Sequence, residues 1–231
     1  MNNIFELIII FILVAFLSYI PIIGPYFKLF NTMIHETGHA LAAILSGGRV
    51  RSISLFQNTG GLAITSHRGF IGRVFTLLAG YPTASVFSVA YIFALTEGWY
   101  TYIAMTLAVI LVYNVIFWVR NIIGWVWIVS VLAGLYFLYT NQYWTSFELG
   151  LTIIGLMLLM QAFLSAWVVF IISLKDKHEA GDASILANTT KLPAILWGSF
   201  FVLQGAGFFI LGASVWLGFD IITFVQVNVL H

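Results

Sequence analysis

The sequence contains no cysteine and very little charge. Without cysteine, disulfides and thiolate metal ligands are both excluded. Only 7% of the 231 residues are charged, whereas soluble domains carry about 25%. The 9 basic and 8 acidic residues give a net charge of +1, so the chain offers no basic surface for nucleic acid. These scarcities argue against an ordinary soluble domain and against a nucleic-acid-binding protein.

Hydrophobic residues make up 61% of the chain and fall into long runs. A helix that crosses a lipid bilayer needs about 20 predominantly apolar residues. Runs of that kind lie at 3–21, 73–96, 99–118, 121–140, 148–173 and 194–216. The segment 27–46 is also long enough to span, although it carries two histidines and a glutamate. The sequence therefore predicts an all-α polytopic membrane protein with about seven transmembrane helices, forming one membrane-embedded domain over 1–231.

Two polar stretches interrupt the apolar runs. Residues 49–66 alternate between apolar and polar side chains on either side of an Asn/Gly-rich turn, which is typical of a β-hairpin. Residues 175–192 hold much of the remaining charge, and a short helix is expected to begin at Asp182, before Pro193. We therefore expect one small hairpin directly after 27–46 and a polar segment late in the chain.

The basic residues predict how the chain is oriented. Cytoplasmic loops of membrane proteins carry an excess of lysine and arginine. If the N-terminus is cytoplasmic, only Lys28 lies in an outer loop. The basic residues then on the cytoplasmic side are Arg49, Arg51, Arg68, Arg73, Arg120, Lys175, Lys177 and Lys191. We therefore expect the N-terminus, the hairpin and the 175–192 segment to share the cytoplasmic side of the plasma membrane.

The motif that carries chemistry is His-Glu-Thr-Gly-His at residues 35–39. Positions four apart lie on one face of a helix, so His35 and His39 can direct both imidazoles at one metal ion. Glu36 is placed to take a proton from a metal-bound water and return it to a leaving group. One further oxygen ligand would complete a site suited to Zn²⁺. The alternative to a metal site is a polar cluster that holds helices together through hydrogen bonds. Ionisable residues inside a membrane helix, however, usually serve a function.

The run His-Glu-Thr-Gly-His-Ala-Leu-Ala-Ala-Ile-Leu-Ser-Gly-Gly-Arg-Val, from His35 to Val50, resembles the active-site helix of the site-2 protease (M50) family. In that family small residues, a Gly-rich helix end and a β-hairpin follow the metal-binding motif. More narrowly, the chain resembles the M50B-like branch of small bacterial membrane proteins. The resemblance implies that His35 and His39 are zinc ligands, that Glu36 is the catalytic base, and that the membrane is bacterial.

The third zinc ligand is expected in the polar segment 175–192, because it shares a side of the membrane with the motif helix end. We favour Asp182, and the M50B-like branch is similar here in having an Asp-Ala pair ahead of a helix. Asp176, His178 and Glu179 are alternatives, and Asp182 could instead cap its helix. Better-known M50 members place a ligand aspartate in an Asn-x-x-Pro…Asp-Gly motif that this chain lacks.

These features predict an intramembrane zinc metalloendopeptidase that cleaves a membrane-protein substrate within or near the bilayer. Water is expected to enter from the cytoplasm, and an exposed strand of the hairpin could hold the substrate extended. Asn114 and Asn121 could bind substrate, although helix packing or capping is the commoner role of such residues. Three alternatives remain: a catalytically inactive metal-binding scaffold, a metal or proton transporter, and a CAAX-processing type of zinc protease.

Overall fold

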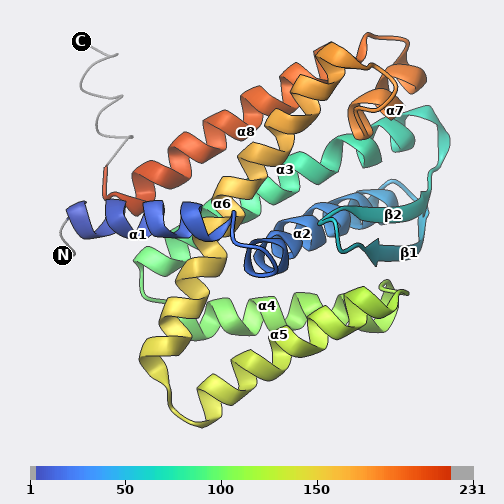
Figure 1. Ribbon diagram of the computed structural model, residues 1–231. Coiled ribbons are helices and arrows are strands. Elements are labelled where there is room, and N and C mark those ends of the chain that lie inside the picture. Colours follow the sequence, from blue (N-terminus) through green and yellow to red (C-terminus); the bar gives the residue numbers. More distant parts are fainter. Residues whose placement is uncertain (1–3, 220–231) are drawn as a thin grey trace.

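A computed structural model describes residues 4–219. Within this range the chain forms helices and one hairpin (Figure 1). The elements are α1 Ile4–Leu17, α2 Ile23–Leu45, β1 Arg49–Leu55, β2 Gly61–Ser66, α3 Gly69–Thr96, α4 Tyr100–Phe117, α5 Ile122–Thr140, α6 Trp144–Lys175, α7 Asp182–Thr190 and α8 Ala194–Trp216. The predicted helical class, the hairpin at 49–66 and the short helix beginning at Asp182 are confirmed.

Five of the described helices, rather than the predicted seven, are long and apolar enough to cross a membrane: α3, α4, α5, α6 and α8. The two that fall short are the two before the hairpin. α1 has only 14 residues, because the chain turns at 18–22 around Pro21 instead of continuing as helix. α2 has 23 residues but also carries His35, Glu36 and His39, which lower its hydropathy. The polytopic membrane class holds, with a lower number of spans.

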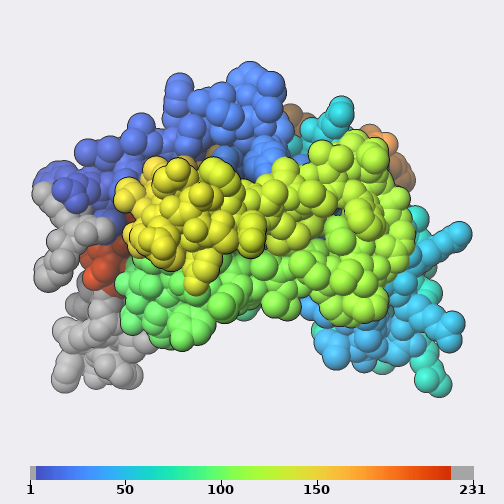
Figure 2. Space-filling view, turned by 90° about the horizontal axis from the view of Figure 1, so that it is seen from below, coloured from blue at the N-terminus to red at the C-terminus, as the bar shows by residue number. Residues whose placement is uncertain are grey.

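The helix α2 lies in the middle of the molecule (Figure 1). It packs against α3 and α6, while α3 and α6 both contact α8. Close packing of α2 against α3 depends on Gly38, because a Cβ there would lie 2.7 Å from Thr83 Cβ. On the other side, α4 and α5 pair and cover the face seen from below, between α6 and the hairpin (Figure 2). The motif helix is therefore held on several sides by spanning helices.

The motif helix ends at Gly47 and Gly48, where the chain turns into the hairpin. Gly47 has a φ of 76°, a conformation that glycine adopts without the steric cost of a Cβ. The Gly48 N–H donates to Ala43 O (2.8 Å) and the Gly47 N–H donates to Ile44 O (2.9 Å). This pair of bonds is a Schellman C-cap. It ends α2 and directs β1 back along the motif helix.

Of the two outer edges of the hairpin, only the β1 edge pairs with another backbone segment among the described residues. β1 and β2 are antiparallel, with Ile53 opposite Ala63 and Leu55 opposite Gly61. On its other edge β1 bonds to the segment between α4 and α5: the Ile53 N–H donates to Trp118 O (2.7 Å) and Ile53 O accepts from the Arg120 N–H (3.1 Å). Among the described residues, no strand pairs with the outer edge of β2.

Asn121 extends this β1 edge with its side chain. Its amide accepts from the Leu55 N–H (3.1 Å) and donates to Leu55 O. It therefore supports the hairpin, and the structure gives Asn114 a similar packing role, because the Asn114 amide donates to Thr37 Oγ1 (3.1 Å) in the core. Neither residue lines the cavity described below.

Replacing Asn121 with alanine is expected to destabilise the fold by about 1–3 kcal/mol, because both backbone groups of the buried Leu55 lose their partner. Thermal unfolding of the detergent-purified protein measures the effect. Asn141→Ala is the matched control, since the exposed Asn141 amide bonds only to Phe137 O of its own helix. Equal unfolding temperatures for the two variants would contradict the role assigned to Asn121.

Candidate metal centre

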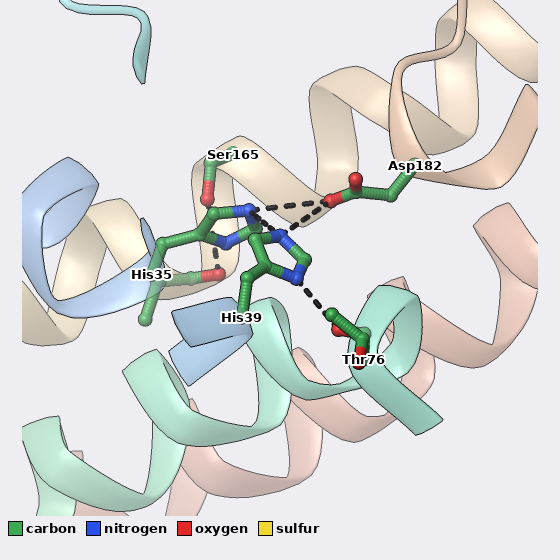
Figure 3. A network of polar contacts seen from close by, with 6 residues as sticks. His35, His39, Thr76, Ser165 and Asp182 are labelled. Atoms are coloured by element: carbon green, nitrogen blue, oxygen red, sulfur yellow. Dashed lines mark hydrogen bonds and ion pairs between the residues drawn. The ribbon is translucent and has the colours of Figure 1, made fainter. Parts of the chain in front are cut away.

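Three side chains from two distant segments converge at one point (Figure 3). His35 and His39 lie one turn apart on α2, and Asp182 is the first residue of α7. Each histidine Nε2 lies 3.2 Å from Asp182 Oδ2, and the two Nε2 atoms lie 2.9 Å apart. The three side chains could hold a metal ion, because one ligand atom of each lies within 4.8 Å of the others.

The histidine rings are held from behind by α3. His39 Nδ1 donates to Thr76 O (2.7 Å), so in the neutral ring Nε2 carries the lone pair that faces the cluster. The His35 ring packs edge to face on Tyr81, with 4.5 Å between ring centroids. Both rings are therefore oriented before any ligand arrives.

Asp182 is positioned by the turn that precedes α7. Ser184 fixes this turn, because its Oγ accepts from the Ala180 N–H (2.8 Å) and donates to Lys177 O (2.7 Å). Ala180, Ala183 and Leu186 bury α7 against α3 and α8. Gly181, not Asp182, stands at the N-cap, and no side chain caps the helix. The alternative of a capping aspartate is therefore not what the structure shows.

The Asp182 carboxyl is held in its ionised form. Burial alone would raise its pKa, but His39 and His35 act against burial, and the net pKa lies below its usual range. An ionised carboxylate therefore faces two ring nitrogens, each at 3.2 Å. At that distance a carboxylate oxygen and a ring nitrogen need a proton or a cation between them. Two imidazole nitrogens and one carboxylate oxygen form a ligand set typical of catalytic zinc sites, so these residues fit zinc.

The helix α3 approaches the cluster through a glycine. A Cβ on Gly80 would lie 2.5 Å from His35 Cε1 and 2.6 Å from each histidine Nε2. Any side chain at this position would therefore enter the space in which the nitrogens meet. Gly80 precedes Tyr81 and Pro82 in the middle of an apolar helix, an unusual run that could have marked the position in the sequence.

Glu36 lies next to the cluster but faces the hairpin. Its side chain is buried, with 6% of the residue exposed. A Cβ on Gly61 would lie 2.6 Å from Glu36 Oε1, so the carboxylate contacts the start of β2. The carboxylate is therefore close to the histidines without being one of the three converging groups.

A cavity of about 720 Å³ is lined by His35, Glu36, His39 and Asp182, among other residues. Its walls come from α2, the hairpin, α3, α6 and α7, and Ser165 of α6 lies beside His35 (Figure 3). The lining continues along β2 from Gly61 to Thr65 and also includes the polar side chains of His67 and Arg73. The pKa of His67 lies below its usual value because of burial and the nearby charge of Arg73, so His67 is neutral at pH 7. The cavity thus joins the converging side chains to the unpaired edge of the hairpin.

The model of the family described as "Peptidase M50B-like" matches residues 7–212. The chain belongs to this M50B-like family. The match covers every helix described above except the first residues of α1 and the end of α8. Comparisons with curated proteins and with solved structures gave no match. Membership in the M50B-like family, together with the apolar helices, implies a membrane metallopeptidase.

The four candidates for the third ligand lie in different surroundings in this M50B-like chain. Asp176, His178 and Glu179 are exposed and do not line the cavity. Asp176 instead accepts from the His178 N–H (2.9 Å), within the turn before α7. Only Asp182 of the four lies against the two histidines. Sequence reasoning did not single out Thr76, Gly80 and Tyr81, which orient or adjoin the rings.

Proposed function

We propose that this M50B-like protein is an intramembrane zinc metalloendopeptidase that cleaves another membrane protein within or near the bilayer. The observation that carries the proposal is the convergence of His35, His39 and Asp182 in one cavity. A glutamate and an unpaired strand edge lie in the same cavity. A metal-independent packing cluster would need none of this open space.

The residues divide into ligands and a base. His35, His39 and Asp182 would hold one Zn²⁺. A bound zinc ion polarises a carbonyl and lowers the pKa of a water molecule towards 7. Glu36 would accept the proton of the attacking water at its carboxylate and deliver it to the nitrogen of the leaving amine. Its burial beside the two histidines keeps the carboxylate within the reacting volume.

The free edge of β2 is suited to hold the substrate in an extended form. The Ile53 backbone bonds to Trp118 and Arg120, away from β2. In an antiparallel pair, facing residues either exchange both hydrogen bonds or neither. Ala63, opposite Ile53, therefore turns its N–H and C=O towards the outer edge that lines the cavity, where the Glu36 carboxylate accepts a hydrogen bond from the Ala63 backbone. A substrate segment could add to this edge by backbone pairing if it displaces Glu36 from Ala63, which would expose its carbonyls to attack.

The proposed orientation places the cavity towards the cytoplasm. Lys and Arg are expected on the cytoplasmic side of a plasma membrane, and Arg73 lines the cavity while Arg49 and Arg51 belong to the adjacent β1. Water and the substrate would therefore reach the zinc from the cytoplasmic side. The N-terminus would be cytoplasmic, because that orientation puts all the basic residues except Lys28 on the cytoplasmic side.

Asp182→Ala is expected to remove most of the zinc, because the only carboxylate among the converging side chains is lost. Zinc affinity should fall at least about 10–100-fold, because loss of a residue that only supports a metal ligand already costs that much. Elemental analysis of the purified variant measures the occupancy. Asp176→Ala is the matched control, since Asp176 is exposed outside the cavity. Full occupancy in Asp182→Ala would place the third ligand elsewhere.

The proposed activity is tested by mapping new protein termini in membranes. Cells that produce the wild type are compared with cells that produce Glu36→Gln, and new termini are identified by mass spectrometry. The proposal predicts termini within or next to transmembrane segments that form with the wild type only. Chelation of the isolated membranes should stop their formation and added zinc should restore it. If wild type and variant yield the same termini, the protein is better described as a metal-binding scaffold.

A further inference from the structure

Asn31 is a buried residue whose side-chain oxygen has no hydrogen-bond partner among residues 4–219. It lies on α2 one turn before His35, and only 6% of the residue is exposed. Its Oδ1 is buried and makes no hydrogen bond with any described residue. Buried polar atoms are nearly always hydrogen-bonded, and the exceptions call for an explanation. Asn31 lines the same cavity as His35 and Glu36, so a ligand bound in that cavity could supply the missing partner.

The position of Asn31 follows from two neighbouring stripes of α2. Thr32 and Glu36 form the stripe that faces the hairpin: Thr32 Oγ1 donates to Thr59 O (2.6 Å), and Glu36 contacts Gly61. Asn31 and His35 are four residues apart, as are His35 and His39, so they form the adjacent stripe. Both stripes line the cavity.

A peptide that adds to the free edge of β2 would have one edge of its own still unpaired. Half of its backbone groups would bond to β2, and the other half would point away from the hairpin. Backbone groups that become buried in the cavity need hydrogen-bond partners. Asn31 and His35 line the same cavity as β2, so they are within the space that such a peptide would enter.

The chain already uses an asparagine in this way at the opposite edge of the same sheet. The Asn121 amide bonds to both the N–H and the C=O of Leu55. An amide side chain therefore satisfies a strand residue that no further strand covers. Asn31 carries the same group in the cavity, and the described part of the chain gives its Oδ1 no partner.

We infer that Asn31 is a positioning residue that binds the backbone of the substrate next to the scissile peptide bond. Its amide accepts from a substrate N–H, donates to a substrate C=O, or does both. The ligand is an extended polypeptide, recognised through its main chain and not through particular side chains. This inference rests on the proposed function, since it assigns a role only if a peptide is drawn over the zinc site.

The test compares zinc-binding probes with and without a peptide backbone. Acetohydroxamate binds zinc but has no peptide group beyond it. Two dileucyl hydroxamates extend from the same zinc-binding group, one towards the N-terminal side of the scissile bond and one towards the C-terminal side. Affinities are measured by titration calorimetry on zinc-loaded, detergent-purified wild type and Asn31→Ala. We expect at least one dileucyl probe to bind about tenfold more weakly to the variant, as one lost hydrogen bond to a buried partner implies. Acetohydroxamate should bind both proteins equally.

Thermal unfolding separates positioning from packing. Loss of an unsatisfied buried amide should leave the unfolding temperature of Asn31→Ala unchanged or raise it, whereas loss of a packing contact should lower it. Asn31→Leu keeps a similar volume and provides a second variant if the alanine change impairs folding. Gln204→Leu is the matched control, because Gln204 also has a buried Oε1 without a partner but does not line the cavity.

The outcomes distinguish this inference from the function on which it rests. If acetohydroxamate fails to bind the wild type, the proposed zinc site itself fails. If all probes bind and neither dileucyl probe is weakened in Asn31→Ala or Asn31→Leu, the inference is overturned while the zinc site stands. Equal weakening of every probe would also overturn it, since the effect would then lie at the zinc and not at the peptide backbone.

Discussion

Glu36→Gln is expected to lower the rate of substrate cleavage by about 10²–10⁴-fold, the contribution typical of a general base. Glutamine has nearly the same shape as glutamate but cannot accept the proton of the attacking water. Zinc occupancy should be unchanged, because Glu36 is not one of the three converging side chains. The fold should be kept as well, since the neighbouring Gly61 leaves the same space for the amide. The measurement is formation of the wild-type cleavage product in reconstituted membranes, with zinc determined on the same sample.

Glu97→Gln provides the control for this prediction. It makes the same chemical change at the C-cap of α3, outside the cavity, and should cleave as the wild type does. Wild-type turnover in Glu36→Gln would remove Glu36 from the mechanism. A loss of zinc together with activity would make Glu36 part of the metal site instead of the base.

Gly80→Ala is expected to weaken zinc binding as strongly as loss of a ligand would. The added Cβ would lie 2.6 Å from both histidine Nε2 atoms, which is far closer than nonbonded atoms approach. The atoms that must move belong to the ligand rings, and His39 is tied to Thr76 O at 2.7 Å. Because the rings cannot yield without losing their alignment, zinc affinity should fall at least about 10–100-fold. Competition with a zinc-selective chelator measures the change.

Gly134→Ala is the matched control for the glycine change. Gly134 lies within α5, and a Cβ there would have no neighbour within 4 Å. This variant should bind zinc normally and gain up to about 1 kcal/mol of stability, since alanine favours helix over glycine. Normal zinc affinity in Gly80→Ala would show that α3 does not approach the ligands as closely as the structure indicates.

The parts of the fold that could be predicted depend on short-range patterns. Apolar runs predicted the spanning helices, alternation around an Asn/Gly turn predicted the hairpin, and the spacing of His35 and His39 put both rings on one helical face. The number of spans was predicted less well. A run such as 3–21 shows its apolar length in the sequence, but the helix ends at Leu17 because the chain turns before Pro21.

The rest of the site depends on packing between segments far apart in the sequence. Asp182 lies 143 residues from His39, and four candidates in one polar stretch could not be separated by spacing alone. Asp182 was favoured because it begins a short helix before Pro193 and because the M50B-like branch is similar there, whereas the structure brings it to the histidines through the burial of α7. Gly80 and Asn31 could not be placed, because a close helix approach and an unpartnered amide exist only once α2, α3 and the hairpin are assembled.

The most direct test of the account is the zinc content of the detergent-purified wild type, prepared without chelators, beside His39→Ala. The account predicts about one zinc per wild-type chain, because two imidazoles and one carboxylate fit a single ion. It predicts almost none in His39→Ala, with both proteins folded. A folded wild type without zinc, or a variant that keeps all of it, would contradict the assignment of His35, His39 and Asp182 as the metal centre.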